Sequence, residues 1–132
     1  MRIRILAGLL LVAGLFTTGS VASARYTAGD RQWTVVNFPD AVLVQDKFVM
    51  GPVLIVHDAA KMARGEACTT FYRFETGVGP REEIVSFHCV PAKAQAVDNT
   101  TFTLKPSADL GCKRLIAYQI GGDTEVHAIP EK

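Results

Sequence analysis

Residues 41–56 read AVLVQDKFVMGPVLIV, a series of short apolar blocks separated by turn residues. Gln45-Asp46 lies between the first two blocks, and Gly51-Pro52 precedes the third. Valine-rich blocks of about four to eight residues bounded by such turn residues are typical of β-strands. The pattern predicts a hairpin over 41–50, followed by a strand over 53–56 that is covered on both faces.

Similar blocks recur along the rest of the chain. They are short, rich in valine, threonine and aromatic residues, and separated by turn residues. Further strands are expected at 32–38, 68–74, 84–90, 100–104, 113–120 and 126–129. This spacing predicts an all-β fold: a single antiparallel β-sandwich, or a small open barrel, of about 7 to 8 strands.

One segment favours a helix. Asp58 can cap the free N–H groups of a turn formed by residues 59–64, and Gly65 suits the left-handed residue that ends such a turn. One short helical turn is therefore expected near 58–65.

The first 24 residues have the features of an export signal. Arg2 and Arg4 precede an apolar run over 5–16, and Ala22 and Ala24 occupy the small-residue positions of a cleavage site. A run this short indicates a cleaved signal rather than a membrane span. We expect residues 1–24 to be a signal peptide, and residues 25–132 to be a periplasmic or secreted domain without membrane insertion.

The composition of the expected mature chain limits its function. Removing 24 of 132 residues leaves 108, and removing two of the 14 basic residues leaves 12 against 13 acidic ones, a formal charge of −1. A nucleic-acid surface would require a basic excess or stripe, so no nucleic-acid partner is expected. The sequence does not identify any other partner.

Three cysteines remain after cleavage: Cys68, Cys89 and Cys112. If strands 68–74 and 84–90 pair with Cys68 opposite Cys89, one mostly apolar face collects residues 68, 72, 74, 85, 87 and 89. This register predicts a Cys68–Cys89 disulfide in an oxidising compartment and a free thiol at Cys112. The alternatives are a bridge from Cys112 to either of the others, or three buried thiols.

Catalytic motifs are absent from the sequence. It has no G-x-S-x-G elbow and no C-x-x-C pair, and no acid is placed to orient His88 beside Ser86. We therefore expect a non-catalytic exported domain with a binding or cell-envelope role and no cofactor.

The alternative is a periplasmic copper-binding protein. His57 and Met62 flank the expected helical turn, and His88, His127 or the thiol of Cys112 would complete the ligand set. Imidazole, thioether and thiol donors suit copper. A Cys68–Cys89 disulfide would remove those two sulfurs as thiolate ligands.

Residues 41–56 also resemble the strand–turn–strand opening of small exported bacterial β-domains. Those domains have a valine-x-valine, glycine-aspartate-lysine, apolar, proline-glycine-threonine-tyrosine pattern, whereas this chain has Gln45 for the glycine and the reversed order Gly51-Pro52. The resemblance implies a β-sandwich of the cell envelope and no activity, and it carries over no catalytic residue.

Overall fold

The structure is a computed structural model that describes residues 18–20, 24–107 and 109–132. The described part contains these elements: β1 (Thr18–Ser20), β2 (Ala24–Ala28), β3 (Arg31–Val44), β4 (Lys47–Asp58), α1 (Ala59–Ala63), β5 (Thr69–Glu75), β6 (Gly79–Phe87), β7 (Val90–Lys93), β8 (Thr101–Pro106), β9 (Lys113–Gln119) and β10 (Glu125–Ala128). The expected all-β fold with one short helix is confirmed.

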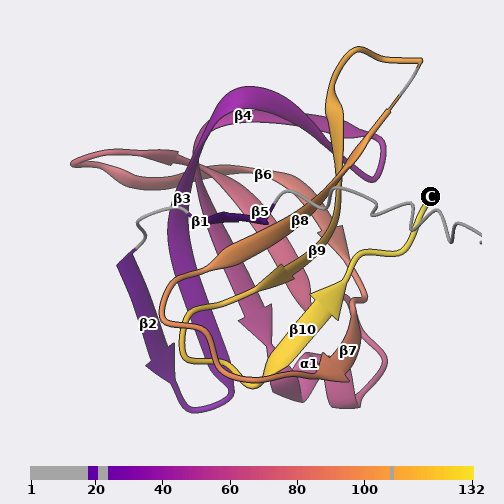
Figure 1. Cartoon of the computed structure of the whole chain (residues 1–132). Coiled ribbons are helices and arrows are strands. Elements are labelled where there is room, and N and C mark those ends of the chain that lie inside the picture. The colour runs from indigo at the N-terminus through magenta and orange to yellow at the C-terminus, as the bar shows by residue number, and fades with distance from the viewer. Residues whose placement is uncertain (1–17, 21–23, 108) are drawn as a thin grey trace, which may run out of the picture.

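All the strands belong to one hydrogen-bonded sheet that curls into a half-barrel (Figure 1). Its main path runs β1-β8-β9-β3-β4-β5-β6, while β2 pairs with β3, and β10 pairs with both β7 and β9. The open-barrel form of the expectation therefore describes the sheet better than a two-sheet sandwich does. The sheet is also mixed, because β3 and β9 pair in parallel through Val42↔Lys113.

The long β3–β4 hairpin lies in the middle of the strand order of the curled sheet. Its turn lies at Gln45-Asp46 as expected, and Gln45 takes the positive φ of 53° that a tight hairpin turn requires. The blocks expected as separate short strands merge into two long ones. Pro39 does not end β3, because it falls where the register shifts between Phe38 and Val42, and a bulge tolerates the missing N–H.

The β5–β6 pair is antiparallel as expected, but its register is one residue away from the expected one. Thr69 lies opposite Phe87, and Phe71 lies opposite Val85, so Cys68 precedes the paired region. Phe71 is buried, while the expected core residues Tyr72 and Phe74 are only half-buried. Thr69 can face the core because its hydroxyl hydrogen-bonds the Tyr118 hydroxyl, which leaves no buried polar atom unpaired there.

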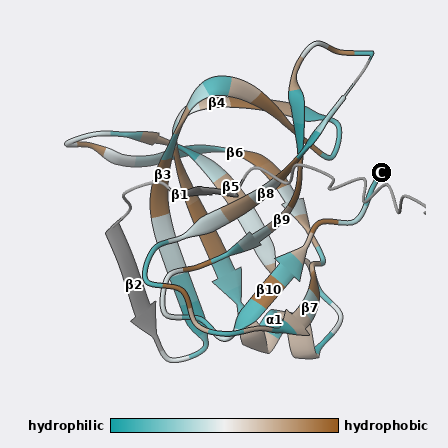
Figure 2. Cartoon of the chain, in the orientation of Figure 1, coloured by the Kyte–Doolittle hydropathy of each residue, from teal (hydrophilic) through white to brown (hydrophobic). Residues whose placement is uncertain are grey.

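The core fills the inside of the curled sheet. Its fully buried side chains include Val36, Ile55, Phe71, Leu115 and Tyr118. Hydrophobic and hydrophilic residues alternate along the strands, as the colours of Figure 2 show. Burying each large apolar side chain contributes about 1.5–3 kcal/mol, so the inward-facing set is the main source of stability.

Helix α1 connects β4 to β5 and is built as expected. The Asp58 carboxylate accepts a hydrogen bond from the Lys61 N–H at 3.1 Å, and Gly65 has a φ of 73°. Among the described residues, no helix has the length and apolar character needed to cross a membrane.

Most of the predicted signal peptide, residues 1–17 and 21–23, lies outside the described residues. The backbone of Thr18–Ser20 within it pairs with β8. Cleavage after Ala24 would remove β1 and leave nearly all of β2 in place, so the cleavage site stays a prediction.

Candidate metal centre

Four segments that are distant in sequence meet at one end of the half-barrel, where α1, β7 and β10 lie together (Figure 1). They contribute His57 from the end of β4, Cys68 before β5, Cys89 between β6 and β7, and His127 from β10. All four side chains are buried, with exposed fractions of 3% or less. We call these four residues the His–Cys cluster.

The turn around α1 brings His57 and Cys68 together. Because His57 pairs with Thr69 across β4 and β5, the chain entering the helix lies beside the chain that leaves it. The Asp58 N–H donates to the Cys68 carbonyl oxygen at 2.8 Å, which closes this junction.

The two sulfurs lie next to each other. The Sγ atoms of Cys68 and Cys89 are 2.9 Å apart, and the Cys89 N–H donates to the Cys68 Sγ at 3.2 Å. One imidazole nitrogen of His57 and both Sγ atoms lie within 4.8 Å of one another. The predicted disulfide partners are therefore neighbours, although both cysteines are free thiols here and their ladder positions are not directly opposed.

His127 approaches the same sulfurs from β10. Its Nδ1 lies 3.5 Å from the Cys89 Sγ, and its ring centroid lies 4.1 Å from that of His57. Its Nε2 lies 2.9 Å from a carboxylate oxygen of Asp123. A carboxylate that accepts the Nε2 proton leaves Nδ1 as the lone-pair nitrogen, facing Cys89.

Met62 covers the cluster from α1. Its Sδ lies 3.7 Å from the Cys89 Sγ, and its side chain is half-buried against the core. A thioether is a soft, weak ligand, so Met62 can act as an additional donor or as an apolar cover.

The His57 ring lacks a partner that its chemistry requires. Its Nε2 is buried and has no hydrogen-bond partner among the described residues. Leaving a buried polar nitrogen unpaired costs about 1–3 kcal/mol. An ion held by this nitrogen would supply the missing partner.

Burial shifts the pKa values of His57 and Cys89. Desolvation, followed by the nearby His127 ring, lowers the pKa of His57 from 6.5 to about 4, so its imidazole is neutral at pH 7. Desolvation and the hydrogen bond with Cys68 raise the pKa of Cys89 to about 12. The imidazole is thus ready to coordinate, whereas the Cys89 thiol must lose its proton to a metal ion.

Cys89, His127 and Asp123 also form a sulfur–imidazole–carboxylate line of the kind used in nucleophilic catalysis. A nucleophilic cysteine needs a lowered pKa and access to substrate. Cys89 has a raised pKa and an exposed fraction of 0%. This geometry favours coordination over acyl transfer.

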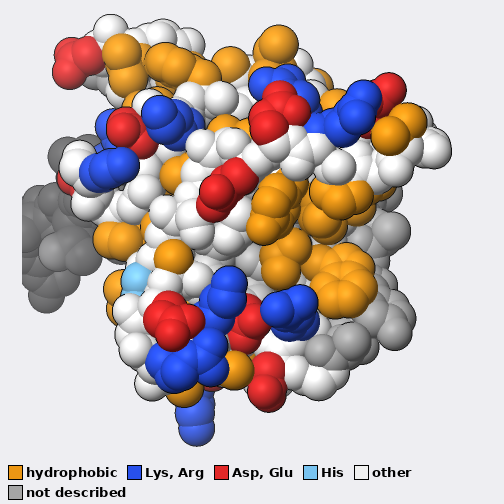
Figure 3. Space-filling view, turned by 180° about the vertical axis from the view of Figure 1, so that it is seen from behind, with side chains coloured by type: hydrophobic (Ala, Val, Ile, Leu, Met, Phe, Trp, Pro, Cys, Tyr) orange, Lys and Arg blue, Asp and Glu red, His pale blue; other side chains and the backbone are white. Residues whose placement is uncertain are grey.

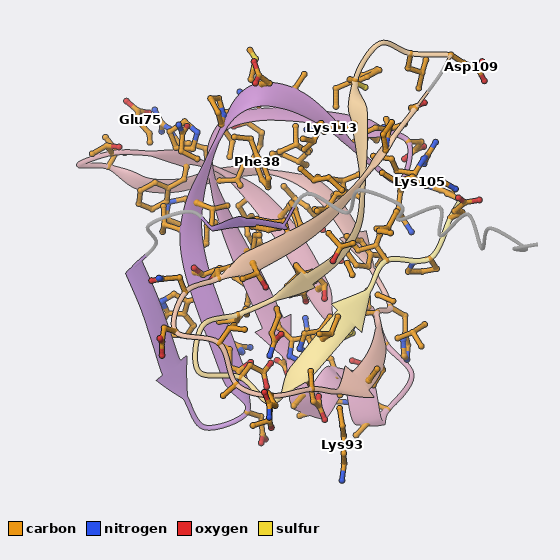
Figure 4. The ribbon with its side chains drawn as sticks, viewed as in Figure 1. Phe38, Glu75, Lys93, Lys105, Asp109 and Lys113 are labelled. Carbon is orange, nitrogen blue, oxygen red and sulfur yellow. The ribbon has the colours of Figure 1, made fainter. Side chains whose placement is uncertain are left out.

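The structure brings together three of the four predicted metal ligands, His57, Met62 and His127, and adds the two cysteines. It places His88 outside the cluster, because that side chain is exposed and its Nδ1 lies 2.8 Å from the Cys89 carbonyl oxygen. Cys112 is half-buried in the β8–β9 connection, directly before Lys113. Figure 4 shows Lys113 and Asp109 at the end of the molecule opposite Lys93 of β7, which extends from the cluster end.

Sequence reasoning missed the orienting role of Asp123. The signal that could have found it is the four-residue spacing from Asp123 to His127 on either side of a turn.

Comparison of the chain with protein-family models, with curated proteins and with solved structures gave no match. The resemblance of residues 41–56 to small exported β-domains therefore stays an expectation.

Proposed function

We propose that this protein is an exported, non-catalytic β-domain that binds a transition-metal ion through the His–Cys cluster. Two observations carry the proposal: one His57 ring nitrogen and the sulfurs of Cys68 and Cys89 lie within 4.8 Å of one another, and the Nε2 of the same ring is buried without a hydrogen-bond partner. Two cysteines and two histidines are a common donor set for tetrahedral zinc.

One separation between donor atoms already matches such an ion, and a second needs a small adjustment. Two ligands on a tetrahedral zinc, with bonds of about 2.3 Å to sulfur and about 2.0–2.1 Å to nitrogen, are separated by about 3.5 Å. Cys89 Sγ and His127 Nδ1 already have this separation, at 3.5 Å. The two sulfurs, 2.9 Å apart, need to separate to about 3.8 Å.

The charge of the surroundings favours a divalent ion. The two negative charges of two thiolates neutralise the charge of Zn²⁺, whereas with Cu⁺ they would leave a net negative charge in a buried site. The carboxylates of Asp58 and Asp123 act on His57 and make the surroundings more negative. A divalent ion is therefore expected to bind more tightly than Cu⁺ for electrostatic reasons.

Copper is the second candidate because of one specific contact. Met62 Sδ lies 3.7 Å from the Cys89 Sγ, and thioether donors prefer copper to zinc. If copper is the native ion, Met62→Leu will weaken copper binding and leave zinc binding unchanged.

Four protein ligands leave no open coordination position, so the ion would be structural or stored rather than catalytic. It would join β4, β10 and the segments before β5 and after β6. Binding only to the folded state raises stability in proportion to the logarithm of free metal concentration.

The test is metal analysis of reduced protein purified without an affinity tag, followed by Zn²⁺ and Cu⁺ titration. We expect equimolar binding, more than about 100-fold weaker in His57→Ala, because a direct ligand exceeds the effect of an orienting residue. His88→Ala is the matched control, since His88 is exposed and outside the cluster. Equal affinity in the parent and His57→Ala, or no bound metal in the reduced parent, would overturn the proposal.

A further inference from the structure

We propose that the His–Cys cluster is redox-gated: oxidation of Cys68 and Cys89 to a disulfide by a small disulfide compound expels the metal ion. This inference rests on the proposed metal binding and adds its regulation. The dithiol form would hold the ion, and the disulfide form would not.

The separation of the two sulfurs carries the argument. At 2.9 Å, the Sγ atoms lie between the geometries of the two states. A disulfide needs about 2.05 Å and two thiolates on a tetrahedral zinc need about 3.8 Å, so each state is about 0.9 Å from the present separation. The same pair of side chains can reach both states with small movements, and cannot satisfy both at once.

The surroundings of the pair make the two cysteines unequal. Cys68 lines a pocket of about 270 Å³ on the outer face of β3, β4 and β5, whereas Cys89 is not among its lining residues. The pocket is bounded by apolar residues of these strands, including Leu54 and Val56, and by the charged Arg31, Asp58 and Lys61. Figure 3 shows the rear face of the molecule, where hydrophobic side chains gather between groups of Lys/Arg and Asp/Glu side chains. Cys68 is 2% exposed and borders this pocket, whereas Cys89 is 0% exposed and does not, so Cys68 is the cysteine nearer to a small disulfide that enters there.

The proposed reaction is thiol–disulfide exchange in two steps. The Cys68 sulfur attacks a small disulfide RSSR, which forms a mixed disulfide and releases one RS⁻. The Cys89 sulfur then attacks the Cys68 sulfur, which forms the Cys68–Cys89 bond and releases the second RS⁻. The two cysteine thiolates lose two electrons, the small disulfide gains them, and Zn²⁺ leaves with two RS⁻ in place of its two thiolate ligands.

Formation of the disulfide leaves the two histidines without the two thiolates as co-ligands. Two imidazoles and a thioether form a much weaker site than a set with two thiolates. By linkage, a bound ion must also make oxidation of the pair less favourable at equilibrium, because each event opposes the other by the same free energy.

The experiment uses zinc-loaded protein carrying Cys112→Ser, so that the third thiol cannot form bridges. Oxidised glutathione is added, the released zinc is measured with a chromogenic chelator, and the disulfide is mapped by mass spectrometry of a non-reduced digest. We expect equimolar zinc release in step with the Cys68–Cys89 link, less oxidation at equilibrium when zinc is in excess, and restored binding after reduction with dithiothreitol.

The outcomes separate the two proposals. The gating alone is overturned if zinc stays bound after the Cys68–Cys89 link has formed. It is also overturned if oxidised glutathione does not oxidise the pair in the metal-free protein. A reduced protein that binds no metal overturns the proposed function and the gating together.

Discussion

Acid destabilisation of the metal-free, reduced protein is expected to depend on one buried histidine. The pKa of His57 is about 4 in the folded state and 6.5 without the protein environment, chiefly because burial disfavours the charged ring. The unfolded chain therefore takes up the proton first as the pH falls. The stability that comes from a neutral His57 is complete above pH 6.5 and is lost progressively from pH 6.5 down to about 4.

The size of this effect follows from the two pKa values. Their difference, 6.5 − 4, is about 2.5, which corresponds to about 3 kcal/mol in the free energy of unfolding. The assay is urea denaturation of metal-free protein between pH 7.5 and 4, for the parent and for His57→Leu. The variant removes the titrating ring and its unpaired Nε2, while every carboxylate remains.

The comparison of the two curves isolates the His57 contribution. We expect the parent to lose about 3 kcal/mol more than His57→Leu over this range, because carboxylates distant from His57, such as Glu66 and Glu82, affect both proteins alike. Parallel curves for the two proteins would refute the reasoning, since they would show that His57 titrates normally in the folded state.

Three further predictions test the register, the orienting carboxylate and the export signal. Phe71→Ala should destabilise the protein by about 3–5 kcal/mol and Phe74→Ala by about 1 kcal/mol in thermal or urea unfolding, because only Phe71 is fully buried; the reverse order would restore the register expected from sequence. Asp123→Asn should weaken metal binding by about 10- to 100-fold in a competition titration, because His127 loses the carboxylate that fixes its ring; unchanged affinity would remove this role. Mass spectrometry of the exported protein should find the first residue after Ala24 at the N-terminus, and a retained signal segment would contradict that expectation.

The features of the fold that were predictable from sequence depend on neighbouring residues. The turn at Gln45-Asp46 follows from polar residues between apolar blocks, and α1 follows from a capping aspartate and a terminating glycine. Such signals lie within a few residues of the structure they produce. They specify elements, but they do not specify how a sheet closes.

The β5–β6 register was not predictable because its cause lies far away in the sequence. Thr69 and Tyr72 compete for the core face, and hydrophobicity alone favours the tyrosine. The hydroxyl of Tyr118, 49 residues from Thr69, makes burial of the threonine favourable. A sequence pattern cannot reveal Tyr118 as the partner of Thr69, because β9 and β5 are not neighbours in the strand order and the two side chains meet only inside the curled sheet.

The members of the His–Cys cluster were only partly predictable for the same reason. Residue types indicated His57, Met62 and His127, whereas the ladder argument favoured a disulfide between Cys68 and Cys89, which would remove their thiolates as ligands. The pairing of His127 with Pro91 on β7 brings β10 beside Cys89, and this long-range pairing cannot be seen in the sequence. His88 was also predicted as a ligand, but its side chain is exposed and lies outside the cluster.

Metal-edge X-ray absorption of the zinc-loaded, reduced protein tests the central claim most directly, because it reports the atoms bonded to the ion. We predict two sulfur neighbours at about 2.3 Å and two nitrogen neighbours at about 2.0–2.1 Å, with one sulfur lost in Cys89→Ser. The Cys112→Ser variant should give the same spectrum as the parent. A first shell of oxygen and nitrogen atoms alone would contradict the account, because it would place the ion away from Cys68 and Cys89.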